Sequence, residues 1–226
     1  PTVETSNNND NLTLTICLGY EPDSLYPLAV GSQAARDVLQ AIYDGPIDYL
    51  NGQPTPVILE ELPQPSNGGV AFTPLEVQAG DVVINTAGQV VALQAGTRVF
   101  PSGCSTSACA IVWDGTTPLQ LDQPRATFRL KAGLTWSDGQ PLTASDSVYG
   151  YRLAADPHSP TLKLAFEQTA DYRALDGVTV EWVGKPGLVR ESYADYFWMP
   201  LPQHAWGVYS ASDLLEVALL LKEAGL

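Results

Sequence analysis

Alternation of apolar and polar residues predicts strands in several parts of the chain. Leu12–Leu18 changes between apolar and polar residues with a period of two, which is typical of a strand with one buried face. Asp81–Leu93 predicts a hairpin, because Gly88 in its middle tolerates the backbone conformation of a tight turn. Thr127–Leu130 and Val178–Val183 are further predicted strands.

Two helices are predicted near the ends of the chain. Ser32 can cap a helix over Gln33–Tyr43, because a serine hydroxyl accepts a hydrogen bond from the free N–H groups of the first turn. Another helix is expected to begin near Ser210 or Ser212 and to end at Gly225. Its buried stripe is expected to contain Val217, Leu220 and Leu221.

The segment Arg125–Pro157 contains a complete strand–turn–helix pattern. Its strand is followed by a turn at residues 137–139, Ser-Asp-Gly. Thr143 and Asp146 then have the spacing of a capping box, with an acid in place of the usual Glu or Gln. A helix over Ala144–Ala155 is predicted to follow and to stop before the closing proline.

This run of strand, Trp-Ser-Asp-Gly turn, Pro, Leu-Thr-Ala and helix closely resembles the signature of bacterial extracellular solute-binding proteins of family 5. These proteins are the receptors that deliver oligopeptides, dipeptides or nickel complexes to ABC importers. A looser similarity extends over most of the chain. Tyr20–Leu25 resembles the family's ligand-facing loop, and Leu175–Val180 resembles the start of a later strand.

The resemblance implies an α/β fold of the periplasmic-binding-protein-like (type II) kind. The chain is expected to supply the first lobe, with a mixed sheet flanked by helices. Residues 12–45 and 126–226 would form this discontinuous lobe, residues 46–125 an inserted β-rich subdomain, and residues 1–11 a flexible tether. The second ligand-binding lobe is expected to be absent from this chain. In the family, the two lobes close around the ligand by a hinge motion.

Composition and charge exclude some classes of function. The net charge is −14, and only 11 Lys and Arg residues are spread along the chain, which argues against binding to nucleic acid. The acidic surface is interpreted mainly as a solubility feature, with attraction of cationic ligands as the alternative. No apolar run reaches the roughly 20 residues that span a bilayer. The expected location is extracytoplasmic, either periplasmic or at the cell surface, with a lipid anchor on the full-length protein.

The chain contains three cysteines, and their pairing is relevant to the compartment in which the protein works. Cys104 and Cys109 bracket the loop Ser105–Ala108, and a disulfide between them is favoured over a metal site, because the spacing lacks a second Cys or His pair. An oxidising compartment outside the cytoplasm would permit the bond. Cys17 is interpreted as a buried, unpaired small apolar residue. We expect no metal and no cofactor.

Candidate ligand-binding residues come from the resemblance. It implies that Tyr20, Glu21, Pro22 and Asp23 line the first-lobe side of the ligand cleft. Tyr20 can offer a ring face and a hydroxyl, and Glu21 or Asp23 can meet a cationic group. The alternative is that Asp23 caps the turn while Tyr20 packs on the core.

An enzyme is disfavoured, and no catalytic residue is assigned. His158 and His204 are the only histidines, and the chain contains no nucleophile elbow, zinc-protease motif or phosphate-binding loop. Trp136 and Tyr149 are expected to be core residues.

The expected function is ligand capture for an ABC importer. The expected partners are an oligopeptide or dipeptide and the importer's permease subunits, and the receptor is expected to be a monomer. Three alternatives remain open. They are a receptor of the same family for a nickel chelate or another solute, a surface adhesion or structural module, and an extracellular hydrolase.

Overall fold

The computed structural model describes residues 19–43 and 45–223 of the chain. The predicted strand Leu12–Leu18, the predicted tether at residues 1–11 and Cys17 lie outside the described residues. No described helix is both long enough and apolar enough to cross a membrane. The elements in chain order are α1 (Gln33–Ile42), β1 (Ile47–Leu50), β2 (Gln53–Pro56), η1 (Pro65–Asn67), β3 (Val70–Val77), β4 (Val82–Ile84), β5 (Val90–Ala92), β6 (Arg98–Val99), β7 (Ile111–Val112), β8 (Leu119–Arg129), α2 (Ala144–Ala155), α3 (Leu164–Glu167), β9 (Thr169–Ala174), β10 (Thr179–Gly184), η2 (Ala194–Tyr196), α4 (Gln203–Trp206) and α5 (Ala211–Glu223).

Four antiparallel strands form the central sheet, in the order β3-β8-β10-β9. Strand β8 is eleven residues long and pairs with β3 over most of its length and with β10 over its last five residues. The mixed sheet expected from the sequence is therefore not seen among the described strands. Strands β9 and β10 are joined by a short turn, and so short a connection permits only antiparallel pairing.

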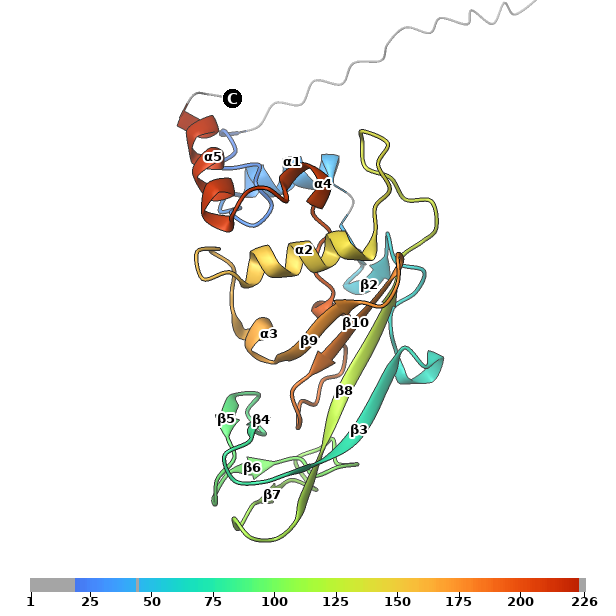
Figure 1. Ribbon diagram of the computed structural model, residues 1–226, viewed down its shortest axis with the longest axis vertical. Helices are drawn as coiled ribbons and strands as arrows, with labels where there is room; N and C mark the ends of the chain where they lie inside the picture. Colours follow the sequence, from blue (N-terminus) through green and yellow to red (C-terminus); the bar gives the residue numbers. More distant parts are fainter. Residues whose placement is uncertain (1–18, 44, 224–226) are drawn as a thin grey trace, which may run out of the picture.

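Strands β3 and β8 connect the two ends of the molecule, with helices gathered at one end and the small hairpins β4–β5 and β6–β7 at the other (Figure 1). Strand β3 lies within the stretch 46–125 that the sequence assigns to an insertion, yet it pairs with β8 over eight residues. The expected boundary at residue 126 falls inside β8. The central sheet is therefore shared between the two predicted parts.

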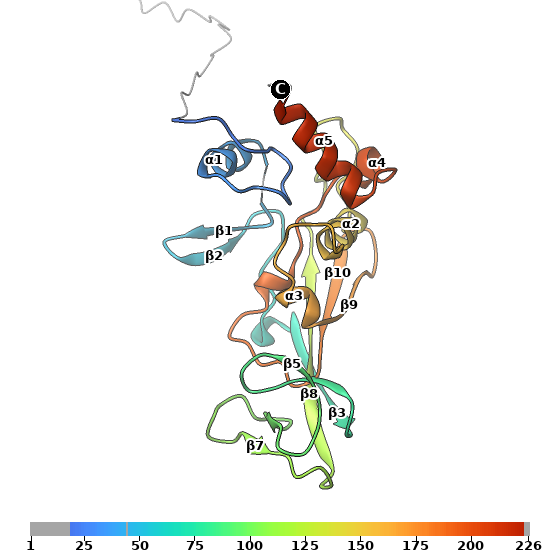
Figure 2. The same ribbon diagram turned by 90° about the vertical axis from the view of Figure 1, so that its left-hand side faces the viewer.

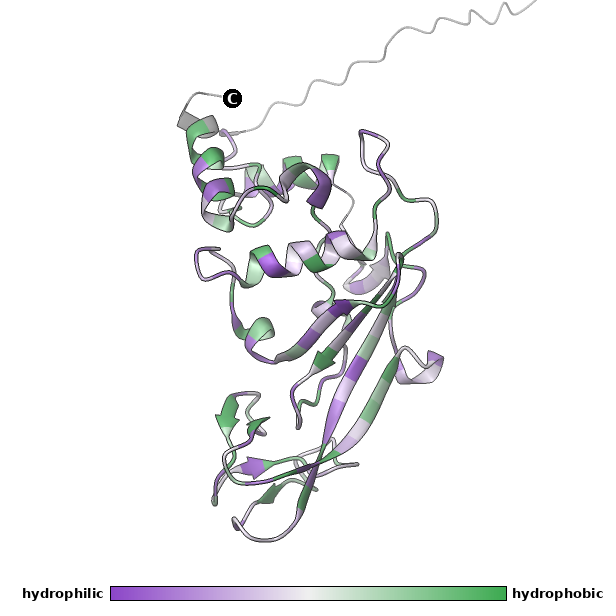
Figure 3. Cartoon of the chain, viewed as in Figure 1, coloured by the Kyte–Doolittle hydropathy of each residue, from purple (hydrophilic) through white to green (hydrophobic). Residues whose placement is uncertain are grey.

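Helix α2 and the segment around η2 cover one face of the central sheet. Phe128 on β8 and Trp182 on β10 are fully buried, at 0% exposure. Trp182 stacks on Tyr196 with ring centroids 4.1 Å apart, and Phe128 lies 5.1 Å from Phe197. Hydrophilic and hydrophobic residues alternate along β8 (Figure 3), as its burial pattern also shows. This alternation places the apolar residues of β8 in the core.

The described helices agree with their local signals. Ser32 accepts a hydrogen bond from the Ala35 backbone N–H at 3.1 Å at the start of α1. The Asp146 carboxylate accepts from the backbone N–H of Thr143 at 2.8 Å and from its hydroxyl at 3.1 Å, which caps α2. Helix α2 has the predicted bounds.

The predicted buried stripe of α5 is wrong for Val217 and Leu220. These residues are 46% and 55% exposed. Helix α5 joins the core through its first residues, Ala211 and Leu214. Leu219 is also exposed, at 52%, and Figure 2 shows α5 at the end of the molecule.

The structure joins Cys104 and Cys109 by a disulfide between β6 and β7. Closing a loop this short removes conformational entropy from the unfolded chain, and we expect reduction to lower the free energy of unfolding by about 2 kcal/mol. Urea denaturation of the oxidised and reduced protein measures the difference. A Cys104→Ser/Cys109→Ser double variant is the control, and its stability should match that of the reduced protein. Equal stability of the two redox forms would contradict the expectation.

Candidate functional site

The loop with the predicted ligand-binding residues lies directly before α1. Tyr20 is 60% exposed and Glu21 is also exposed, while Pro22 is half-buried. Tyr20 therefore does not pack on the core of the described protein, in contrast to the alternative interpretation. The loop leaves these three side chains accessible to a ligand.

Asp23 has a different environment. Its carboxylate accepts hydrogen bonds from the Ser32 hydroxyl at 2.7 Å and from the backbone N–H groups of Ser32 and Gly31 at 3.0 and 2.8 Å. These bonds, the Ser32 hydroxyl above all, hold the pKa of Asp23 below its usual range. A Cβ at Gly31 would lie 2.4 Å from the carboxylate, so the glycine is needed for this close approach. Asp23 thus fixes the loop onto the start of α1.

A cavity of about 450 Å³, which we call the motif cavity, lies where four segments meet. The segments are the end of α1, the residues after β2, the turn between β8 and α2, and the stretch from residue 200 to α4. Figure 1 shows the turn rising beside α4. The size and mixed lining are typical of small-molecule sites. The lining residues are Ile42, Tyr43, Ile58, Leu134, Thr135, Trp136, Ser137, Asp138, Leu142, Pro200, Pro202, His204, Ala205 and Trp206.

Aromatic side chains form much of the wall. The Trp136 ring lies edge-on to Tyr43, with centroids 6.5 Å apart, and 6.3 Å from the His204 ring. The Trp136 Nε1 atom is buried and has no hydrogen-bond partner among the described residues. The sequence predicted Trp136 as a core residue, but it is half-buried and lines the cavity. Trp206 lies edge-on to Tyr26, which connects the loop before α1 to this wall.

Asp138 and His204 form the polar part of the lining. Asp138 Oδ2 lies 2.7 Å from His204 Nε2, although the two residues are 66 positions apart. The backbone N–H of Gln140 donates to Asp138 Oδ1 at 3.0 Å. This N–H and then His204 hold the pKa of Asp138 below its usual range, so the carboxylate is ionised at neutral pH. Burial raises the pKa of Tyr43, and its phenol therefore stays neutral.

Helix α2 holds the fourth segment of the cavity in place. The backbone N–H of Leu201 donates to the Asp146 carbonyl, and that of Gln203 donates to Asp146 Oδ1, both at 3.1 Å. Tyr149 is buried, as predicted, and its hydroxyl donates to the Trp206 carbonyl at 2.8 Å. The predicted cap of α2 therefore also positions the wall that carries His204.

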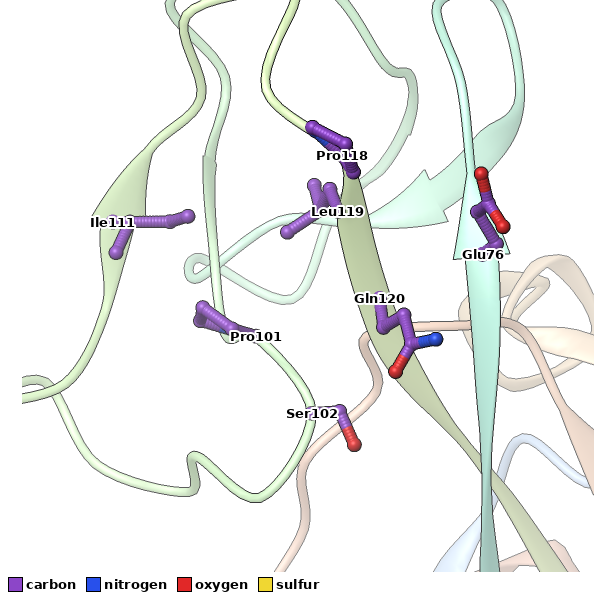
Figure 4. A pocket seen from close by; sticks show the side chains of 7 residues that line it. All are labelled: Glu76, Pro101, Ser102, Ile111, Pro118, Leu119 and Gln120. Carbon is purple, nitrogen blue, oxygen red and sulfur yellow. The ribbon is translucent and has the colours of Figure 1, made fainter.

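A second cavity, of about 440 Å³, lies among the hairpins at the other end of the protein (Figure 4). Ile111 and Leu119 point into it from two sides, and Glu76 is its one acidic residue. Its lining contains no aromatic side chain, unlike that of the motif cavity. The motif cavity, with its aromatic and charged lining, is therefore the stronger candidate site.

Within the described part of the chain, no group of three or more His, Cys, Asp or Glu side chains could hold a metal ion.

Comparison with known proteins also points to the segments that line the motif cavity. Residues 120–205 match the family described as bacterial extracellular solute-binding proteins, family 5 Middle. This segment supplies Leu134–Leu142 and Pro200–Ala205, which belong to two of the four segments around the motif cavity. Over 33 residues the chain is 61% identical to the probable deoxycholate-binding periplasmic protein YgiS of Escherichia coli K12, a match covering 15% of this chain and 6% of that protein.

Two solved structures align with most of this chain. The oligopeptide-binding protein of Thermus thermophilus, complexed with a pentapeptide, aligns with a TM-score of 0.53 and 16% identity over 83% of this chain. A periplasmic oligopeptide-binding protein of Borrelia burgdorferi aligns with a TM-score of 0.49 and 15% identity, over 85% of this chain and 32% of its own. The present chain spans about a quarter of the length of the Thermus protein, at 25%.

The likeness to the Thermus structure concerns the fold. The described residues have the α/β fold of the type II periplasmic binding proteins. Within that class, the resemblance to the family 5 solute-binding proteins is confirmed through residues 120–205.

Proposed function

We propose that this chain is the first lobe of the ligand-capture component of an ABC importer, and that its ligand is an oligopeptide or a dipeptide. The observation that carries the proposal is the family 5 match over residues 120–205, because this same segment forms much of the motif cavity. The pentapeptide bound to the protein of similar fold supports a peptide as ligand. The ligand would be released unchanged, as in transport rather than catalysis.

The loop before α1 would contact the ligand from one side of the cleft. Tyr20, Glu21 and Pro22 remain accessible, whereas the hydrogen bonds of Asp23 give it the role of holding the loop. A second lobe would close over the ligand, and the closed form would be recognised by the permease subunits. We propose an extracytoplasmic location with a lipid anchor, and a monomeric receptor.

Titration of this chain with pentaalanine, followed by NMR, tests the proposal. We expect binding with a Kd on the order of 1 mM, because one lobe makes only part of the ligand contact. Tyr20→Ala is expected to weaken binding about tenfold, equivalent to about 1.4 kcal/mol.

Tyr49→Ala is the control, since Tyr49 is 62% exposed, lies on β1 and is not among the residues predicted to line the cleft. Its affinity for the peptide should equal that of the unmodified chain. Absence of peptide binding, or equal losses in the two variants, would argue against the proposal. Micromolar binding would instead show that this chain is more than one lobe of the site.

A further inference from the structure

Three aromatic side chains from separate segments line the motif cavity together with one carboxylate. Tyr43 comes from the end of α1, Trp136 from the turn after β8, and Trp206 from α4. Asp138 lies two residues after Trp136 in the same lining. Such a lining has the composition of an aromatic cage with a negative charge in the same cavity.

An aromatic cage attracts cations of a particular kind. The ring face carries partial negative charge and attracts a cation within about 6 Å of its centre, most strongly when the ring is that of Trp. Quaternary and other alkylated ammonium groups suit such sites, because their methyl groups need apolar contact while their charge is spread over a large surface. Ile58, Leu134 and Leu142 supply apolar contact in the same lining.

The charges around the cavity favour a cation. Among the residues that line it, the titratable groups are Tyr43, Asp138 and His204. Asp138 is ionised and Tyr43 is neutral at neutral pH. The net charge of −14 raises the concentration of cations near the protein surface.

We propose that the motif cavity binds an alkylammonium group, with the cation against the rings of Trp136, Tyr43 and Trp206 and near the Asp138 carboxylate. The group would belong to a small quaternary amine or to the ammonium end of a peptide. With a peptide's ammonium end as the ligand group, this inference rests on the proposed function and deepens it; with a small amine, it goes beyond that function.

Comparison of choline with 3,3-dimethylbutan-1-ol tests the proposal on the chain without any substitution. The two molecules have nearly the same shape, but the second is uncharged. We expect choline to bind at least ten times more tightly, as measured by changes in ¹H–¹⁵N NMR spectra. The indole signal of Trp136 should shift, while that of Trp113 should not. Trp113 lies in the distant hairpin region, where its indole N–H donates to the Thr117 carbonyl.

Substitutions then locate the site. Trp136→Leu and Tyr43→Leu are each expected to lower choline affinity several-fold, whereas Tyr49→Leu should leave it unchanged. Equal affinity for choline and the neutral alcohol, or no binding of choline up to about 50 mM, would overturn the proposal. Equal effects of Tyr43→Leu and Tyr49→Leu would overturn it as well.

The source of the ammonium group is tested by competition. Pentaalanine with a free amino terminus displaces choline if the peptide's ammonium end occupies the cage, while N-acetylated pentaalanine does not. If neither peptide displaces choline, the ligand group belongs to a small amine. Both results support a cation site. Because peptide binding is measured separately with the Tyr20 variant, failure of the cage would leave the proposed receptor function standing.

Discussion

Replacing Gly150 with alanine is expected to lower the free energy of unfolding by about 3 kcal/mol. Gly150 lies in the middle of α2, and a Cβ at this position would lie 2.1 Å from the Met199 carbonyl oxygen. Both groups belong to rigid backbone, so the helix and the segment 199–206 would have to separate. The motif cavity would open as a result, because Pro200–Trp206 lines it.

Urea denaturation measures the loss, and the NMR signals of Trp136 and Trp206 report the change in the cavity. Gly177→Ala is the control, because a Cβ at Gly177 meets no atom within 4 Å and its backbone carbonyl can still accept from Ala144. We expect this control to change stability by less than about 0.5 kcal/mol. Equal losses of unfolding free energy in the two variants would show that the close contact of α2 with residue 199 does not determine the stability of the protein.

Replacing Asp146 with alanine is the second large expected effect, a loss of about 2–4 kcal/mol. Asp146 is only 5% exposed, and its carboxylate caps α2 through Thr143 and also accepts from the backbone N–H of Gln203. Alanine would remove the cap and leave these N–H groups without their acceptor. The wall carrying His204 would lose part of its anchor.

Asp213→Ala provides a matched comparison. Asp213 accepts from the backbone N–H and hydroxyl of Ser210 at 2.9 and 2.7 Å, which is the same arrangement at the start of α5. It is exposed, and among the described residues it has no bond equivalent to the one with Gln203, so the expected loss is only about 1 kcal/mol. Asp146→Asn keeps one acceptor oxygen and should retain part of the stability. Thermal and urea denaturation of all three variants distinguish the contribution of the helix cap from that of the hydrogen bond to Gln203. Equal losses of unfolding free energy in Asp146→Ala and Asp213→Ala would contradict a stabilising role of the bond to Gln203.

Local signals predicted several elements well. The bounds of α2 follow from the Thr143–Asp146 pair and the proline at 157, which act within a few residues of the helix ends. The hairpin of β4 and β5 turns at Gly88, whose φ of 76° is easily adopted by glycine. These interactions are determined by neighbours in the sequence, so they can be predicted without knowledge of the fold.

Long-range packing was harder to predict. Nothing in the sequence indicated that β3 would join the central sheet, because strand pairing depends on partners distant in the chain. The periodicity of α5 identifies an apolar face but not what covers it, and Val217 and Leu220 are in fact exposed. Trp136 was expected in the core because aromatic residues on strands usually pack there.

By itself, the sequence determined the local elements, the motif between residues 125 and 157 and the resemblance that it carries, because short-range hydrogen bonds and backbone preferences act between neighbours. Only the tertiary structure brought Tyr43, Trp136 and Trp206 around one cavity and placed His204 beside Asp138. These contacts join residues far apart in the chain, and they depend on how α2 holds the segment 199–206 against the turn after β8.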